Sequence, residues 1–147
     1  MNANPIAHVH RLTLFLLVLL GLQPHGLIAQ EALSVPQRLK LSDANQNFRS
    51  GYFLEAKKGY EALLLEIQDR PEINFMAGKA AFNLRRYQEA LAFFSQADFT
   101  GKEVPNDYHV YLGKALFITY QIDSSQSHFT LALQGLDEKE KAESDAS

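Results

Sequence analysis

The sequence predicts an all-α fold in which about three antiparallel helix hairpins follow one another as an α-solenoid. The first observation is that apolar residues between positions 74 and 97 recur every three or four residues, as on one face of a helix. The second is the short polar break at residues 84–86, which allows only a tight turn between two antiparallel helices. The third is that the same pattern recurs on both sides at a period of roughly 34 residues.

Small and large residues alternate between the two helices of the central hairpin. Gly78 and Ala90 are small and mark where two helix axes can approach, while Tyr87 and Phe94 can fill the space beside that contact. Shifting the pattern by one period in either direction gives two sets of matching residues: Ala44, Phe53, Ala56 and Tyr60 before it, and Gly113, Ile122, Ser125, Phe129 and Ala132 after it.

This arrangement resembles the tetratricopeptide repeat (TPR) family, with repeats at about residues 37–70, 71–104 and 105–136. The central repeat matches the family's pattern of small and large residues at Gly78, Tyr87, Ala90, Phe94 and Ala97. The outer repeats depart from it: the family's early Trp is absent, Ser125 replaces an Ala, and Asn47 replaces a core aromatic residue. The resemblance implies a TPR-like helical repeat domain over residues 30–136.

Residues 1–29 have the composition of a secretory signal peptide. Arg11 is the only charged side chain before Glu31, and residues 12–22 form an apolar core too short to span a bilayer comfortably. Ala29 then offers a small residue for cleavage before Gln30. We therefore expect an exported protein of the periplasm or cell envelope, or a secreted one; an uncleaved membrane anchor is the alternative.

Composition narrows the class further. The chain has no cysteine, so no disulfide can stabilise an exported domain and no lipid-acceptor Cys follows the apolar run. An exported chain without cysteine favours a bacterial envelope over a eukaryotic secretory route. The formal net charge of −3 and the absence of a basic block argue against nucleic acid as the partner.

Capping residues predict where the first helices begin. Ser34 and Gln37 form a capping box that opens a helix ending near residue 49, and Gly51 follows in a turn. A second helix is expected over residues 53–68. Asp69 and Glu72 form another capping-box candidate, which opens the third helix.

The later helices follow from similar signals. The fourth helix is expected over residues 87–97, followed by an irregular connection at 98–104. Pro105 is expected to open a fifth helix that reaches about residue 120, and Asp123 to cap a sixth that ends near 134. Residues 137–147 are almost wholly polar, and form either a helical extension or a disordered tail.

The TPR resemblance implies a concave ligand groove along the first helix of each hairpin. Matching positions on these helices carry three pairs of residues: Asn45 with Phe48, Lys79 with Phe82, and Lys114 with Phe117. Asn83 follows Phe82 and can hydrogen-bond a peptide backbone. An aromatic row beside two ammonium groups suits an extended peptide with apolar side chains and an acidic group. The alternatives are that the Phe row is ordinary core and that the lysines are only solvated.

Chaperone-binding members of the family use a two-carboxylate clamp of Lys, Asn and Arg. The matching positions here include Leu41, Met76, Asp107 and Tyr111, so the clamp is incomplete and a chaperone tail is disfavoured as the ligand.

Catalytic and metal-binding patterns are not recognisable after residue 29. His109 and His128 are the only histidines there, and neither has a carboxylate or a second His at metal-ligand spacing. No Ser lies in a G-x-S-x-G motif. We therefore expect a non-catalytic protein-interaction module or scaffold with no cofactor or metal. Its partner is expected to be another envelope protein or peptide. We expect it to contact a membrane only through residues 1–29, if these are not cleaved.

Two alternatives from other classes stay open. Leu131, Leu133 and Leu136 leave an apolar edge that no capping helix covers, so a structural homo-oligomer, including a homodimer, can form through the last helix. The other alternative is an accessory subunit of an envelope enzyme or a small hydrolase, for which a catalytic constellation should be visible.

Overall fold

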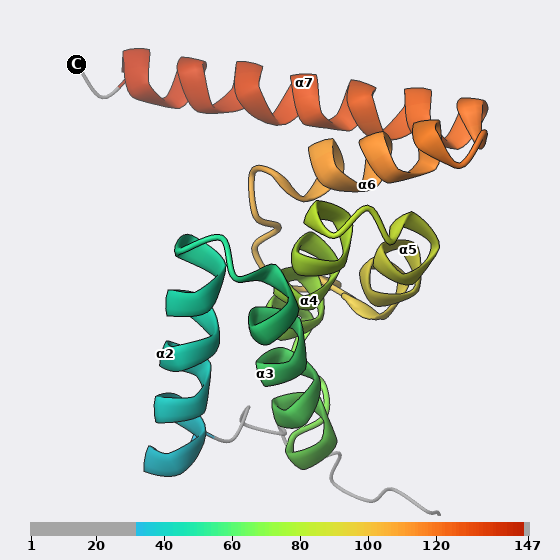
Figure 1. Ribbon diagram of the computed structural model, residues 1–147. Helices are drawn as coiled ribbons and strands as arrows, with labels where there is room; N and C mark the ends of the chain where they lie inside the picture. The colour runs from blue at the N-terminus through green and yellow to red at the C-terminus, as the bar shows by residue number, and fades with distance from the viewer. Residues whose placement is uncertain (1–31, 146–147) are drawn as a thin grey trace, which may run out of the picture. The chain divides into compact units, whose positions relative to one another are not determined.

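A computed structural model describes residues 32–145, which form six α-helices and no strand (Figure 1). The helices are α2 (Val35–Arg49), α3 (Phe53–Glu66), α4 (Pro71–Asn83), α5 (Tyr87–Gln96), α6 (Tyr108–Ile118) and α7 (Ile122–Asp145). The predicted all-α class is confirmed for these residues. The predicted signal peptide lies outside them, and none of the helices described is long and apolar enough to cross a membrane.

Each helix packs on the next one along the chain, and α4 also packs on α6. One buried cluster joins α2, α3 and α4 around Tyr60 and Leu63. A second cluster joins α4, α5 and α6 around Phe75 and Phe94. The central hairpin therefore contributes to both clusters, as expected when each hairpin completes its core against its neighbours.

The three hairpin turns have the same backbone geometry. Gly51, Arg85 and Tyr120 each adopt a positive φ, of 81°, 60° and 64°. In every turn the next residue's N–H donates to a carbonyl five residues earlier, at 2.9 Å, in the pattern that closes a helix with a left-handed residue. The period predicted from the sequence thus recurs in the backbone, while the α-solenoid and the TPR assignment stay predictions.

Large residues of the second helices lie over small residues of the first helices. The ring of Phe94 covers Gly78, and the ring of Phe129 covers Gly113. In the first hairpin the glycine lies on the second helix instead, where Gly59 faces Ala44. The expected close approach is therefore present, and in the central hairpin it is Phe94, more than Ala90, that occupies the space above the glycine.

Ser125 is accommodated at its buried position by a hydrogen bond. Its hydroxyl donates to the carbonyl of Gly113 at 3.0 Å, and its side chain is fully buried at the position that matches Ala56 and Ala90. A buried hydroxyl destabilises a protein little when it has a hydrogen-bond partner, and much more when it has none. The departure from Ala in the third hairpin thus leaves the packing intact.

Three of the six predicted helix starts are correct, those of α2, α3 and α5, and the three predicted starting residues of α4, α6 and α7 are wrong. Ser34 caps α2 with the expected capping box, and α5 begins at Tyr87 as predicted. The capping box at Asp69 is wrong, because Arg70 is the N-cap of α4 and Asp69 turns the chain with a φ of 55°. Pro105 does not open α6; its carbonyl accepts from the N–H of Tyr108, and the helix begins only there.

The last helix begins and ends differently from the prediction. Asp123 lies inside the first turn of α7 and so is not the residue that precedes it. The helix continues past residue 134 to Asp145, because residues 137–143 consist of Asp, Ala and the strong helix formers Glu and Lys. Of the two expectations for the polar end, the helical extension is the one observed through residue 145.

Candidate functional site

Lys79 lies in an aromatic and acidic setting at the meeting point of three helices. Its side chain is only 14% exposed and forms an ion pair with Asp107, the N-cap of α6. Its Nζ lies 5.7 Å from the ring centroid of Phe48 on α2, 5.1 Å from that of Phe75 on α4 and 4.9 Å from that of Tyr111 on α6. The ammonium group therefore already has a carboxylate partner and aromatic faces within cation–π range.

The predicted phenylalanine row divides into packed and exposed members. Phe48 and Phe82 are half-buried, and each ring meets an aromatic residue across its own hairpin turn: Phe53 at 5.4 Å and Tyr87 at 5.3 Å between centroids. Phe117 occupies the same position in the third hairpin but is 58% exposed. The alternative that the phenylalanine row is ordinary core therefore describes Phe48 and Phe82 better than it describes Phe117.

The two asparagines also differ in their surroundings. Asn45 accepts a hydrogen bond of 2.8 Å from the hydroxyl of Tyr60. Burial raises the pKa of Tyr60 to about 12, so the hydroxyl keeps its proton and remains a donor. Asn83 is exposed at the end of α4, where its amide nitrogen donates to the carbonyl of Lys79 at 2.8 Å. Asn45 is thus part of the first hairpin's packing, and Asn83 lies at the surface.

Lys114 is the exposed ammonium of the predicted row. Its Nζ lies 6.0 Å from the ring centroid of Tyr111, whose ring also meets Phe82 at 5.4 Å. Among the described residues no carboxylate forms an ion pair with it. Phe82, Tyr111 and Lys114 are therefore contiguous, and Phe117 follows Lys114 after one helical turn.

These positions define what we call the first-helix surface, after the first helix of each hairpin. Its inner part consists of Asn45, Phe48 and Lys79, whose polar groups and rings have partners within the domain. Its outer part consists of Phe82, Asn83, Lys114 and Phe117, of which the last three are exposed. The structure thus connects Phe48, Phe82, Asn83 and Lys114 through Lys79 and Tyr111. Asn45 is bonded to Tyr60 instead, and the side chain of Phe117 is exposed.

Asp107 and Tyr111 contact the first-helix surface through Lys79, but the sequence analysis does not assign them to it. They were singled out only as departures from the chaperone clamp. Both face Lys79, which lies a full repeat earlier in the chain, so no local spacing signals the contact. The only sequence signal is Asp107 itself, because Asp is a residue type that is favoured at the N-cap of a helix.

Lys57 is the most buried charge of the described chain and was not predicted. It is 5% exposed and donates to Glu61 at 2.8 Å on its own helix and to Glu89 at 2.6 Å on α5. Burial lowers the pKa of Lys57, but hydrogen bonds to the two carboxylates outweigh this and raise it above the usual value. The contact ties the second helices of two successive hairpins and is structural.

His109 and His128 meet across the third hairpin. Their Nδ1 atoms are 3.0 Å apart, and the ring centroids are 5.2 Å apart with planes inclined by only 23°. Because the Nδ1 atoms are close while the ring centres are far apart, the two rings meet edge to edge. In this arrangement the Nδ1–H of one neutral ring can donate to the Nδ1 of the other. Burial lowers the pKa of both imidazoles, and for His109 the charge of His128 adds to the effect. No metal-binding cluster of three or more side chains exists within residues 32–145.

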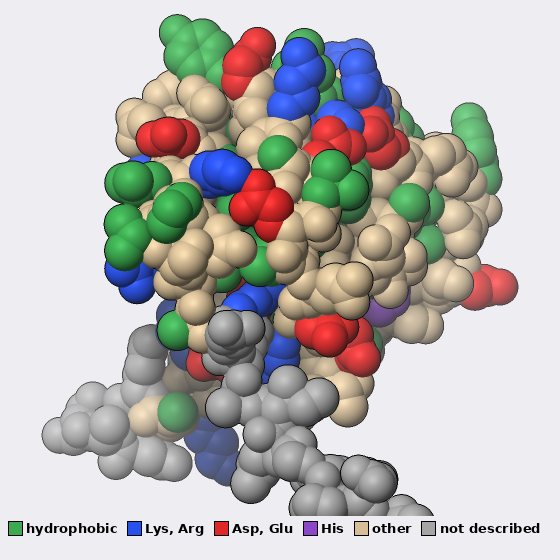
Figure 2. Space-filling model, turned by 90° about the horizontal axis from the view of Figure 1, so that it is seen from below, with side chains coloured by type: hydrophobic (Ala, Val, Ile, Leu, Met, Phe, Trp, Pro, Cys, Tyr) green, Lys and Arg blue, Asp and Glu red, His purple; other side chains and the backbone are tan. Residues whose placement is uncertain are grey.

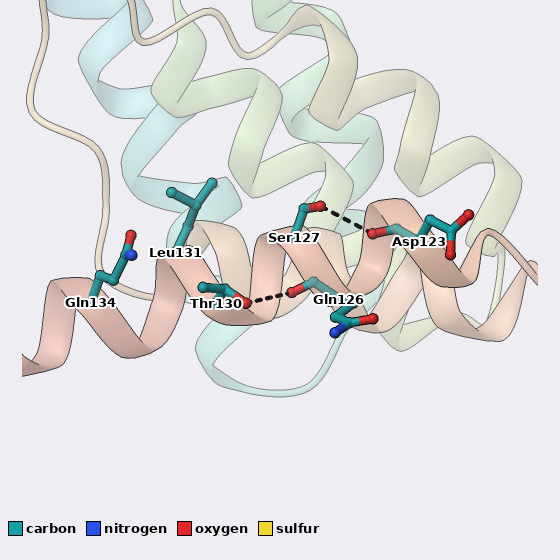
Figure 3. A pocket seen from close by; sticks show the side chains of 6 residues that line it. All are labelled: Asp123, Gln126, Ser127, Thr130, Leu131 and Gln134. Carbon is teal, nitrogen blue, oxygen red and sulfur yellow. Dashed lines mark hydrogen bonds between the residues drawn. The ribbon is translucent and has the colours of Figure 1, made fainter.

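An open hollow of about 480 Å³ lies along α7 (Figure 3). Asp123, Gln126, Ser127, Thr130, Leu131 and Gln134 line it, all from this one helix. The hydroxyls of Ser127 and Thr130 donate to carbonyls of the same helix, at 3.1 and 3.0 Å. A hollow lined by a single helix does not enclose a small molecule, and it is therefore not a candidate active site.

Charged side chains of both signs are interspersed on the face of the domain shown in Figure 2. Lys and Arg lie beside Asp and Glu on that face, where they do not form one basic field of the kind that binds phosphate backbones.

No protein-family model matches the chain, and a search of curated proteins finds no match. The described residues form an all-α domain of three similar helix hairpins, with a phenylalanine at the same position on the first helix of each and lysines beside it on α4 and α6.

Proposed function

We propose that this protein is a non-catalytic binding module or scaffold that holds a protein or peptide partner on the outer part of the first-helix surface. The observation that carries the proposal is the contrast between Lys79 and Lys114. Lys79 has a carboxylate partner in the domain, whereas Lys114 is exposed beside Tyr111 and Phe117 without one. A partner that brings a carboxylate to Lys114 and an apolar side chain to Phe117 complements this surface.

The inner part of the surface supports the outer part. Lys79 connects the first helices of three hairpins, and Tyr111 lies between it and Lys114. Asn83, at the end of α4, offers an exposed amide for the partner's backbone. A preorganised surface loses less entropy when it binds, which favours a rigid hairpin stack as its support. The cell envelope is proposed as the place of action because of the signal-like composition of residues 1–29.

The test is a quantitative affinity capture from an envelope extract of the source cell. The bait is the full chain, compared with a Lys114→Glu, Phe117→Ser double variant. Lys58→Glu is the matched control, because Lys58 is also exposed but lies on α3, the second helix of its hairpin. Lys79→Glu is unsuitable, because it would place a carboxylate beside Asp107 and unfold the support.

A partner retained by the parent chain and by Lys58→Glu, but reduced roughly tenfold or more with the double variant, is the result the proposal predicts. A partner retained equally by all three chains contradicts it. Circular dichroism of each bait establishes that the helices are intact, so loss of binding is not loss of fold.

A second candidate function is favoured by the exposed leucines of α7. Leu131, Leu133 and Leu136 are exposed, and within the described chain α7 packs substantially only on α6. A homo-oligomer that buries these leucines would be a structural protein with no groove ligand. Its test is the mass in solution at several concentrations, where an oligomer that dissociates on Leu133→Glu supports this function and a monomer at all concentrations excludes it.

A further inference from the structure

The turn between α6 and α7 is an exposed apolar tip. Residues 115–122 contain no charged side chain, and Lys114 and Asp123 are the first charges on either side. Four large hydrophobic residues of this segment are exposed, Phe117 by 58%, Ile118 by 40%, Tyr120 by 89% and Ile122 by 49%. In Figure 1 this turn lies at the right edge. So dense an apolar group at a turn marks a contact site on a soluble surface.

The other two hairpin turns provide an internal comparison, because their backbone is the same. Tyr120 corresponds to Gly51 and Arg85, the residues with positive φ. Ile118 corresponds to Arg49 and Asn83, two residues earlier in each turn. Polar residues or glycine therefore satisfy this turn geometry twice in the same chain at the positions of Ile118 and Tyr120, so the turn itself does not require these two side chains to be apolar. Ile122 matches Phe53 and Tyr87, which are aromatic.

Tyr120 is moreover an unfavourable residue for its backbone conformation. A φ of 64° costs a residue with a Cβ roughly 1–2 kcal/mol relative to glycine. Its side chain is 89% exposed, so packing within the described chain does not compensate for this cost. Arg85 carries the same strain in the central turn, so the feature that distinguishes Tyr120 is an exposed aromatic side chain at this position.

Three backbone N–H groups of the tip are satisfied within the turn. The N–H groups of Thr119, Tyr120 and Gln121 donate to carbonyls at the end of α6, at 3.1, 3.1 and 2.9 Å. The hydroxyl of Thr119 donates to the carbonyls of Ala115 and Leu116, at 2.9 and 3.1 Å, and the side-chain amide of Gln121 donates to that hydroxyl at 3.2 Å. Hydrocarbon offers no hydrogen-bond partners, so an unpaired N–H group costs free energy there. A turn whose N–H groups already have partners enters an apolar medium at a lower free-energy cost.

We propose that this tip, formed by Ile118, Tyr120 and Ile122, inserts into the interfacial region of a phospholipid bilayer. Tyrosine suits this region, because its ring is apolar and its hydroxyl reaches the headgroups. Lys114 and Asp123 limit the depth of insertion to the uncharged segment between them. A bilayer accommodates a protruding tip of any shape, whereas a protein pocket must match it. Lys114 borders both the tip and the first-helix surface, while Ile118, Tyr120 and Ile122 do not belong to that surface.

The absence of tryptophan from the chain allows a site-specific test. Tyr120→Trp places a single fluorophore at the tip, and Leu65→Trp places one at an equally exposed residue on α3, since Leu65 is also 89% exposed. Each full-length variant is mixed with vesicles of phosphatidylcholine and phosphatidylglycerol, with and without brominated acyl chains. Bromine quenches only a fluorophore at the depth of the lipid chains.

The proposal predicts blue-shifted emission and quenching that is roughly twofold or more stronger at position 120 than at position 65. Adding Ile118→Asn, which carries the residue found in the central turn, to the Tyr120→Trp background should weaken the quenching. Equal quenching at both positions overturns the proposal, because residues 1–29 alone would then bring the chain to the vesicles. No quenching at position 120 also overturns it, and leaves the tip to a protein pocket.

Discussion

Gly78 lies so close to Phe94 that a Cβ at position 78 would be 2.4 Å from Cε1 of the ring. The same relationship recurs between Gly113 and Phe129, where the distance would be 2.8 Å. Glycine costs stability inside a helix, so its presence at both positions reflects the close approach of two helices and not helix propensity. This contact fixes how the helices of the second and third hairpins pair.

Gly78→Ala is therefore expected to destabilise the domain. Overpacking against a buried ring costs roughly 1–3 kcal/mol, which exceeds the gain of about 1 kcal/mol from helix propensity. Urea unfolding followed by circular dichroism measures the difference. Gly135→Ala is the control, because Gly135 lies in α7 with no atom within 4 Å of the added Cβ. It should leave stability unchanged or raise it by up to about 1 kcal/mol; equal effects of the two changes would refute the contact.

Lys57→Met is expected to lower the free energy of unfolding by roughly 1–3 kcal/mol, because two carboxylates lose a hydrogen-bond donor. The loss is smaller than for a fully buried pair, since the side chains of Glu61 and Glu89 remain about a third exposed. Lys58→Met, on the exposed neighbour, should change stability by less than about 0.5 kcal/mol. A double-mutant cycle with Glu89→Gln measures the contact between α3 and α5. Additive effects would mean that Glu89 does not depend on Lys57.

Stability is expected to fall as the pH drops below the ordinary histidine pKa of 6.5. The pKa of His109 and that of His128 are lowered in the folded domain, so the unfolded chain binds protons first and unfolding becomes easier. The contribution of the two neutral histidines to the free energy of unfolding is complete above pH 6.5. It is lost as the pH falls toward their lowered pKa values in the folded domain. Denaturant midpoints across this range should show a slope that the His109→Asn, His128→Asn variant flattens. An unchanged slope would exclude the pair as its origin.

Tyr120→Gly is expected to stabilise the domain by about 1 kcal/mol, because glycine adopts a positive φ without the strain imposed by a Cβ. Arg85→Gly should act in the same direction at the equivalent position of the central turn. Thermal unfolding of the two variants measures both effects. A loss of stability in Tyr120→Gly would mean that the tyrosine side chain contributes to the fold, and so would argue against a role outside it.

The helices and their pairing were largely predictable from the sequence, because they depend on local signals. The period of three and four residues, the capping box at Ser34 and the turn at Gly51 all act within a few residues of one another. The starts near Asp69 and Pro105 were predicted wrongly for a related reason. Both residue types are common at helix starts and in turns alike, so the residue type alone does not distinguish the two.

The site was less predictable, because its contacts are long-range. The spacing placed Lys79 and Lys114 in equivalent positions, yet only one of them has a carboxylate partner, Asp107, from the following hairpin. Likewise, nothing local pairs Lys57 with Glu89 or brings His109 to His128. Equivalent positions in a repeat thus share backbone geometry, while their electrostatic surroundings depend on residues a whole repeat away.

The most direct test of partner binding is site-specific photo-cross-linking in cells that naturally make the chain. Benzoylphenylalanine replaces Phe117 on the outer part of the first-helix surface or, as the control, Leu65, which is exposed on α3. The account predicts a discrete cross-linked protein from position 117, none from position 65, and loss of the cross-link on Lys114→Glu. No cross-linked protein from position 117, or the same product from both positions, would contradict it.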